Sequence, residues 1–293
     1  MTVSGDPTVA TNNKKDQYLM TIQGPSGASA LALYHFDRSS AARKVRIALA
    51  EKGLSWESRV LDTSVSVREH LQTDYLQLNP RGVVPTLVHD GKVIRESQVI
   101  LEYLEDAFPE PSLRPPDPYA RAMMRLWTKR ADEDMHRQAR SLAVAIYMGE
   151  MFSKAGEAAV SAYYDAMPDS TRVENDRIDR ERGLESPLLG KAVSYFKENW
   201  REINDALAEH DWLAGEQFSL ADISMGVYVT RLAGLGMAPL WQDLDHLIDW
   251  HERFRNRPSY QEAVEAWGDR SSDERRAAAE AAFPVVKTLW DAA

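Results

Sequence analysis

A proline-rich stretch at residues 109–118 constrains the fold of this chain more than any other feature of its sequence. It places five prolines within ten residues, so it cannot form a continuous helix. Strand-like and helical patterns alternate before it, whereas only helical patterns follow it. The sequence therefore predicts two domains, at residues 30–108 and 119–293, joined by a linker at residues 109–118.

The first region predicts elements in the order βαβαββα. Short apolar runs indicate strands, and apolar residues repeating with helical periodicity indicate helices. Asp90 and Gly91 form a hairpin signal between the last two strands. This order predicts an α+β protein whose N-terminal domain is thioredoxin-like. The expected strands are residues 31–36, 56–61, 83–88 and 92–95, and the expected helices are residues 41–52, 67–78 and 97–107.

The second region predicts an all-helical domain. Ser219 and Asp222 resemble a capping box at the start of one of its helices. Residues 165–185, which are dense in mixed charge, predict a long mobile loop. Pro284 is expected to break a helix that follows Ser271. The expected helices are residues 119–151, 188–207, 244–255 and 259–267.

Composition excludes several classes of function. The 293 residues include no cysteine, which removes disulfides, thiol nucleophiles and cysteine-ligated metals. A net charge of -10 disfavours nucleic-acid binding, and no apolar run approaches the ~20 residues of a membrane span. Residues 1–29 have no secretory pattern and predict a disordered tail, so a cytoplasmic protein is expected. A di-metal bundle needs two Glu-x-x-His pairs and further carboxylates, whereas this chain offers the single pair Glu133–His136. No metal is therefore predicted.

Four segments together resemble the glutathione transferase superfamily. They contain Ser39-Ser40 at a strand-to-helix turn, Val84-Pro85 before a strand, Glu96-Ser97 at another such turn, and the Ser219–Asp222 cap. The resemblance spans about residues 31–267. Within the superfamily, the chain is most similar to the serine-type classes, and among these to the bacterial lignin β-etherase branch. The matching segments are residues 34–53, 79–87, 96–105 and 218–223.

The resemblance implies that Ser39 stabilises the thiolate of glutathione, the co-substrate, with Ser40 as the reserve candidate. A thiol of pKa near ~8.5 is mostly protonated at neutral pH. A hydroxyl that donates to the sulfur at a helix N-terminus favours the thiolate by hydrogen bonding and by the helix dipole. The alternative is that both serines only cap the helix.

The resemblance also implies how the tripeptide is held. A cis bond before Pro85 turns the Val84 backbone toward the cysteinyl unit, and Glu96 and Ser97 bind the γ-glutamyl end at a helix N-terminus. It further implies that Asp132 reaches the glutathione bound by the neighbouring subunit of a homodimer. The alternative is that Asp132 lies on a solvated helix face.

The reaction expected is attack of glutathione thiolate on a hydrophobic, aromatic electrophile, with β-aryl ether cleavage as one candidate. The active turn departs from the β-etherases, because Ala41-Ala42 stand where they carry Asn-Ser. The alternatives are a glutathione-dependent dehalogenase, although the dehalogenases' catalytic cysteine is absent, an isomerase, and a non-catalytic glutathione-binding protein. Core packing is the alternative role for the residues expected to line the electrophile pocket, which are Phe36, Tyr147, Met148 and Met151.

Overall fold

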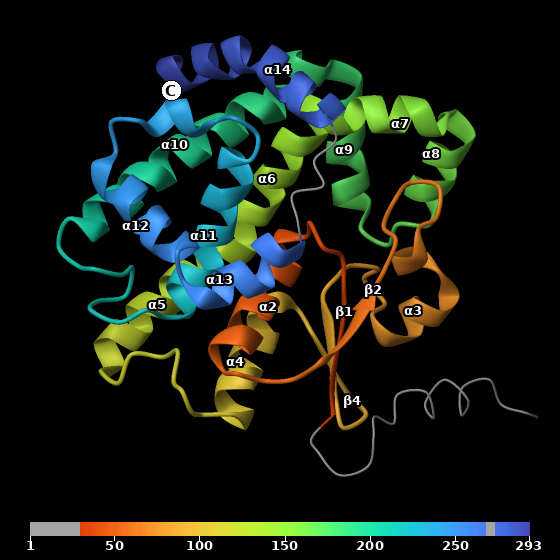
Figure 1. The fold of residues 1–293 in the computed structure, drawn as a ribbon. Coiled ribbons are helices and arrows are strands. Elements are labelled where there is room, and N and C mark those ends of the chain that lie inside the picture. The colour runs from red at the N-terminus through yellow and green to blue at the C-terminus, as the bar shows by residue number, and fades with distance from the viewer. Residues whose placement is uncertain (1–29, 268–272) are drawn as a thin grey trace, which may run out of the picture.

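The structure, a computed structural model, describes residues 30–267 and 273–293. The tail expected at residues 1–29 lies outside the described residues. Figure 1 shows a small sheet at one end of the molecule and a larger group of helices beside it. No helix of the described ranges is long and apolar enough to cross a membrane.

Four strands form one sheet in the order β2-β1-β3-β4. β1 pairs in parallel with β2 and antiparallel with β3, which pairs antiparallel with β4. Leu33 and Leu87 lie opposite each other on the two central strands, and both are fully buried. The predicted α+β class and the βαβαββα order are confirmed. The elements are β1 (Leu31–His35), α2 (Ser40–Glu51), β2 (Glu57–Val60), η1 (Glu69–Leu71), α3 (Thr73–Leu78), β3 (Thr86–His89), β4 (Lys92–Arg95) and α4 (Ser97–Ala107).

The helix predicted at residues 67–78 is instead two short segments, η1 and α3. Gln72 lies between them with an extended backbone (ψ 151°), so the helical hydrogen bonding cannot run through it.

The rest of the described chain is helical, as predicted. Residues 118–155 form one almost continuous helical run with two π-helical turns, which ends at Gly156 (φ 81°). Pro118, expected in the linker, is instead the first residue of α5, where its missing N–H costs nothing. The elements are α5 (Pro118–Arg130), η2 (Ala131–Met135), α6 (His136–Ala143), η3 (Val144–Met148), α7 (Gly149–Ala155), α8 (Glu157–Asp165), α9 (Ser170–Arg182), η4 (Gly183–Glu185), α10 (Pro187–Leu207), α11 (Leu220–Ala233), η5 (Ala238–Trp241), α12 (Asp245–Arg255), α13 (Pro258–Ala263), η6 (Glu265–Trp267) and α14 (Asp273–Ala292).

The prediction of a mobile loop at residues 165–185 is wrong, because most of this segment is helix α9. Asp169 caps its N-terminus by accepting from the backbone N–H of Arg172. The inward side chains are Asp176 and Asp179, which are buried against Arg140 and against Ser141 of α6. Polar contacts bury this helix, so it lacks the apolar stripe that sequence periodicity detects.

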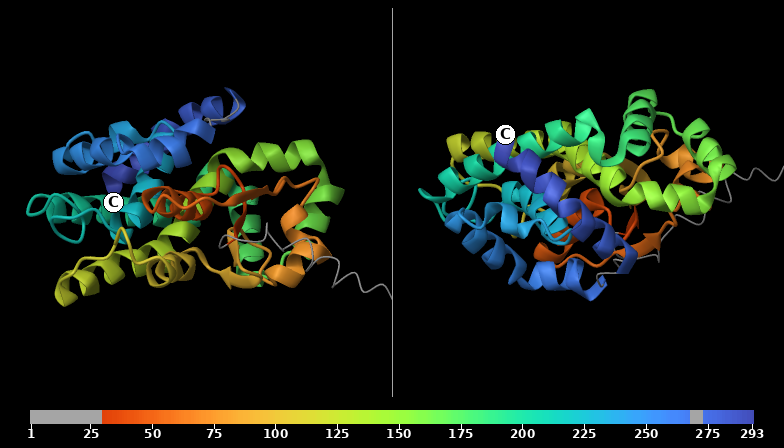
Figure 2. Two further views of the ribbon diagram at one scale, coloured as in Figure 1. Left: turned by 60° about the horizontal axis from the view of Figure 1, so that its bottom comes forward. Right: turned by 90° about the horizontal axis from the view of Figure 1, so that it is seen from above.

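The helix after Ser271 is not broken by Pro284, which lies inside α14. The helix packs on α10, where the Lys197 ammonium donates to the Trp290 carbonyl at 2.6 Å. Seen from above in Figure 2, α14 lies across the other helices. Burial of Ala282 and Val286 on either side of the proline outweighs the loss of one backbone hydrogen bond.

The capping box at the start of α11 is confirmed. The Ser219 hydroxyl accepts from Ala221 and the Asp222 carboxylate accepts from the Ser219 backbone at 2.9 Å. Asp222 is fully buried and also accepts from the indole of Trp250 at 2.9 Å.

Two groups of contacts join the sheet region to the helices. Arg257, just before α13, pairs with Glu51 at the end of α2 through two contacts of 2.6 and 2.8 Å. Arg46 of α2 is buried and donates to the carbonyl of Ala263 at 2.9 Å.

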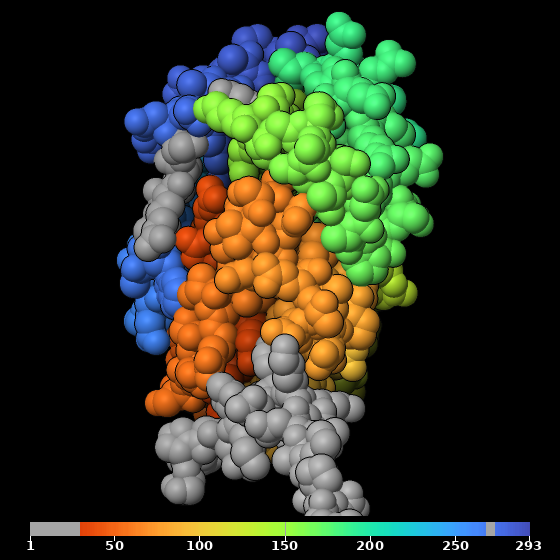
Figure 3. Space-filling view, turned by 90° about the vertical axis from the view of Figure 1, so that its right-hand side faces the viewer, coloured from red at the N-terminus to blue at the C-terminus, as the bar shows by residue number. Residues whose placement is uncertain are grey.

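The α7–α8 pair lies against the segment that connects β2 to α3, as Figure 3 shows from the side. A separate apolar cluster joins Val65 and Leu71 of that segment to Phe152, Val160 and Tyr163. These helices therefore close one side of the space between the sheet and the helical region.

Candidate functional site

The turn between β1 and α2 presents two serines at the N-terminus of a helix. Ser39 is the N-cap of α2, and its Oγ accepts from the backbone N–H of Ala42 at 3.3 Å. Ser40 begins the helix and is 1 % exposed, and its buried Oγ has no hydrogen-bond partner among the described residues. Both line a common cavity, but Ser39 is the more accessible.

The Val84–Pro85 peptide bond is cis, as the family resemblance implies. The Val83 carbonyl just before it accepts from the Tyr75 hydroxyl at 2.6 Å and from the Asn79 amide at 2.9 Å. Gly82 has a φ of 59°, and a Cβ there would lie 2.6 Å from Leu71. Val84 faces the same cavity as Ser39, whereas the buried Pro85 does not line it.

Glu96 and Ser97 lie where β4 meets α4, outside the wall of that cavity. Glu96 has a φ of 66°, which a non-glycine residue rarely adopts and which costs about 1–3 kcal/mol. Its carboxylate pairs with Arg81 at 2.9 Å. Ser97 is the first residue of α4 and is 6 % exposed.

Asp132 lies on the π-helical turn η2 and is exposed. It does not line the cavity. Its charge acts on the buried Lys44, whose pKa is lowered to about 8 because burial outweighs the attraction of Asp132. Within one chain, Asp132 is therefore not assembled with Ser39.

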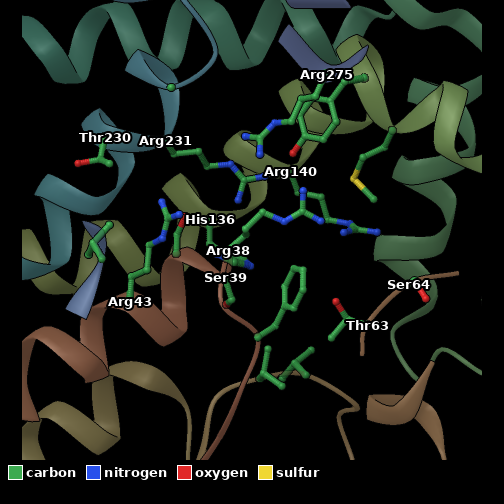
Figure 4. A pocket seen from close by; sticks show the side chains of 18 of the residues that line it. Arg38, Ser39, Arg43, Thr63, Ser64, His136, Arg140, Thr230, Arg231 and Arg275 are labelled. Carbon is green, nitrogen blue, oxygen red and sulfur yellow. The ribbon is translucent and has the colours of Figure 1, made fainter. Parts of the chain in front are cut away.

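The cavity has a volume of about 510 Å³ and lies between the sheet region and the helices. All four residues predicted for the electrophile pocket line it: Phe36, Tyr147, Met148 and Met151. Ser39 and Val84 line the same cavity, so the fold brings residues far apart in sequence to one wall. Figure 4 views this space from close by.

Arginines dominate the polar part of the wall, which the sequence analysis did not predict. Among residues 30–267 and 273–293, the carboxylates that line the same cavity are those of Asp62 and Glu265. The arginines come from both halves of the chain, so no local motif marks them. The part of the chain that the structure describes contributes seven: Arg38, Arg43, Arg140, Arg172, Arg231, Arg255 and Arg275.

These charges change the ionisation of their neighbours. Burial alone would raise the pKa of Tyr147, but positive charges led by Arg231 and Arg275 outweigh it, so the pKa lies below its usual value. Burial, and then Arg231, hold the pKa of His136 well below its usual range. His136 is therefore neutral near pH 7, and its Nδ1 lies 3.2 Å from the Tyr228 hydroxyl.

Residues 30–267 and 273–293 hold no group of three or more side chains suited to a metal ion. Glu133, half of the pair noted in the sequence, lies 3.7 Å from Lys129 instead.

Two family models match most of the chain. The model of the glutathione S-transferase N-terminal domain matches residues 33–112, and that of the glutathione S-transferase C-terminal domain matches residues 155–253.

Individual proteins show the same likeness. Protein LigF of Sphingobium sp. strain SYK-6 is 31% identical over 80% of this chain and 93% of its own length. The crystal structure of β-etherase LigF superimposes with a TM-score of 0.73, covering 81% of this chain and 99% of that one. A maleylacetoacetate isomerase of Pseudomonas aeruginosa is 44% identical over 32% of this chain and 45% of its own. A tetrachloro-p-hydroquinone reductive dehalogenase of Sphingobium chlorophenolicum is 24% identical over 80% of this chain and 95% of its own.

Proposed function

Since this chain belongs to the glutathione S-transferase family, we propose that it catalyses attack of the glutathione thiolate on an electrophile bound between the sheet and the helices. The observation that supports this most directly is the position of Ser39. Its hydroxyl lies at the N-terminus of α2 and on the wall of a cavity large enough for a second substrate.

Ser39 is the residue we propose to stabilise the thiolate. Its oxygen already accepts from the Ala42 N–H, so the hydroxyl hydrogen is available to donate to sulfur. The dipole of α2 favours the same negative charge. Each unit by which the thiol pKa falls corresponds to about 1.4 kcal/mol of preference for the thiolate. Ser40 is less suitable because its Oγ is buried.

Glutathione would lie along the cis-proline segment toward α4. We propose that the Val84 backbone pairs with the cysteinyl unit, and that Ser97 and the α4 N-terminus bind the γ-glutamyl carboxylate. Glu96 would take the γ-glutamyl ammonium. The left-handed backbone of Glu96 supports a functional role, because such strain persists where the surroundings enforce it. In a homodimer, which is part of the proposal, the exposed Asp132 would be available to the neighbouring site.

The reaction we propose is nucleophilic substitution. The sulfur forms a bond to carbon, and the leaving group departs with the bonding electrons as a phenolate or a halide. Similarity to LigF over most of both chains favours β-aryl ether cleavage. The isomerase and dehalogenase relatives make isomerisation and dehalogenation the second candidates.

The test compares Ser39→Ala with the neighbouring Ser40→Ala. Calorimetry with S-methylglutathione measures binding, and turnover is measured with a panel of aryl ethers and aryl halides. We expect Ser39→Ala to lower turnover at least tenfold and to move its pH profile toward higher pH, with binding changed less than threefold. Ser40→Ala should change neither the turnover nor the binding of S-methylglutathione.

Two results would count against the proposal. Loss of binding in Ser39→Ala with unchanged residual turnover would show that Ser39 holds the tripeptide rather than the thiolate. Tight binding of S-methylglutathione without turnover of any compound in the panel would favour a non-catalytic glutathione-binding protein.

A further inference from the structure

Among the described residues that line the cavity, arginines outnumber carboxylates by seven to two. We propose that the electrophile is an aromatic acid, bound by its carboxylate to Arg231 and the neighbouring guanidinium groups, with its reactive carbon facing Ser39. This inference rests on the proposed function and names its substrate class.

Four of the arginines reach the cavity from four different helices. Arg140 comes from α6, Arg172 from α9, Arg231 from α11 and Arg275 from α14. In Figure 4 the side chains of Arg38, Arg140, Arg231 and Arg275 gather around the space beyond Ser39. The charges of Arg231, Arg275, Arg38 and Arg140 all lower the pKa of Tyr147, and the Arg275 guanidinium lies 4.6 Å from the centroid of the Tyr147 ring.

Nearby carboxylates neutralise only some of this charge. Arg140 donates to both oxygens of Asp176, from Nε at 2.8 and 3.1 Å. Arg255 pairs with Glu265 at 3.1 Å. Glu265, one of the two carboxylates that the described residues place on the cavity wall, therefore already has a partner. The other, Asp62, accepts from the Ser64 backbone at 2.8 Å.

Arg231 and Arg172 are less well paired. Neither guanidinium group has a hydrogen bond or an ion pair with any residue of the ranges 30–267 and 273–293, and the Nε of each is buried without an acceptor. The charges of Asp176 and Asp169 act on Arg172, but burial and the charge of Arg140 outweigh them and lower its pKa. A buried polar group left unpaired costs about 1–3 kcal/mol, and more when it is charged. A ligand that brings acceptor oxygens would remove this penalty.

The carboxylates of glutathione would neutralise only part of the positive charge of these arginines. In the proposed pose its γ-glutamyl carboxylate lies at α4, outside the cavity wall, which leaves only the glycyl carboxylate. Arg38, in the same turn as Ser39, is suited to that group. Arg231 and Arg172 lie on helices of the C-terminal half, and they remain for a second anion.

The rest of the wall indicates an aromatic acid. Phe36, Tyr147 and Tyr163 supply rings, and Met148 and Met151 supply adaptable apolar surface. A carboxylate matches guanidinium geometry through paired hydrogen bonds. The reaction stays as written above, because the carboxylate anchors the substrate and takes no part in bond changes.

The test uses two stable conjugates that differ by one charge, S-(4-carboxybenzyl)glutathione and S-benzylglutathione. Titration calorimetry with the full chain should show that the carboxylated conjugate binds at least tenfold more tightly. Added salt should reduce this difference, because screening weakens charge interactions. Arg231→Met should abolish the preference, Arg231→Lys should retain part of it, and Arg276→Gln, at an exposed site next to Arg275, should leave it unchanged.

The outcomes separate the inference from the proposed function. Equal binding of the two conjugates would overturn the inference while leaving glutathione binding intact. Failure of both conjugates and of glutathione itself to bind would overturn the proposed function and the inference together. A preference that survives Arg231→Met in a variant with the native melting temperature would remove Arg231 from the site.

Discussion

Asp176 on α9 accepts two hydrogen bonds from the Arg140 Nε on α6, at 2.8 and 3.1 Å. The Asp176 side chain is 3 % exposed and that of Arg140 is 17 % exposed. Burial alone would lower the pKa of Arg140, but Tyr163 and Asp176 raise it above its usual value. This ion pair holds α9 against α6. It also neutralises part of the positive charge that Arg140 would otherwise present to the cavity.

Asp176→Asn should destabilise the protein by about 3–5 kcal/mol, because it leaves the Arg140 charge buried without its partner. Urea unfolding followed by circular dichroism measures the change in unfolding free energy. The matched control is Glu174→Gln, at an exposed position of the same helix, which should cost less than about 0.5 kcal/mol. An equal loss in both variants would contradict the assignment of α9 as a helix held by this pair.

The free energy of unfolding should decrease as the pH is lowered below about 6.5, in part because of His35. Burial, followed by the charge of Arg46, lowers the pKa of His35 from 6.5 to about 4. Its Nδ1 lies 3.1 Å from an Arg46 nitrogen, and its Nε2 lies 2.9 Å from Ser58 Oγ. Between the two pKa values the unfolded chain binds a proton that the native ring does not, so the unfolding free energy falls as pH falls through this window.

The measurement for His35 is the unfolding free energy at several pH values between about 7 and about 5. His35→Gln should flatten the slope, whereas His210→Gln, at an exposed position, should leave it as in the parent protein. A slope unaffected by His35→Gln would show that this ring does not titrate as described.

Gly226→Ala should be destabilising because α11 and α12 approach closely at that position. A Cβ there would lie 2.6 Å from the ring of Phe254, which is fully buried. Overpacking of this kind costs about 1–3 kcal/mol. In contrast, Gly190→Ala on α10 adds a Cβ at an ordinary 3.9 Å from Leu289 and should stabilise by up to about 1 kcal/mol. Thermal denaturation of the two variants compares them directly, and the same sign of change in both would refute the argument.

Tyr147 should ionise below the usual tyrosine pKa of about 10, because the arginines outweigh its burial. The difference in tyrosinate absorbance between the parent protein and Tyr147→Phe isolates this residue during a pH titration. Arg231→Met should move the midpoint upward, and Arg276→Gln should not move it. A midpoint at or above the usual value in the parent protein would mean that the cavity is less positive than its residues indicate.

Local signals explain which features of the fold around the candidate site could be predicted. Ser39 caps α2, the bond before Pro85 is cis, and Ser219 and Asp222 form a capping box. Each feature depends on residues within a few positions of each other. A strand or helix pattern or a cap is therefore readable from a short stretch of chain, and the βαβαββα order follows from a series of them. The cis bond before Pro85 is instead implied by the family resemblance.

The sequence by itself determined the class of the fold and placed Ser39 at a strand-to-helix turn. Only the tertiary structure decided that α9 is a helix, that α14 continues through Pro284, and that arginines from both halves of the described chain line one cavity. The physical reason is the same in each case. Burial and charge pairing depend on partners more than thirty residues away, such as Asp176 for Arg140, and no local pattern records which distant side chains the fold brings together.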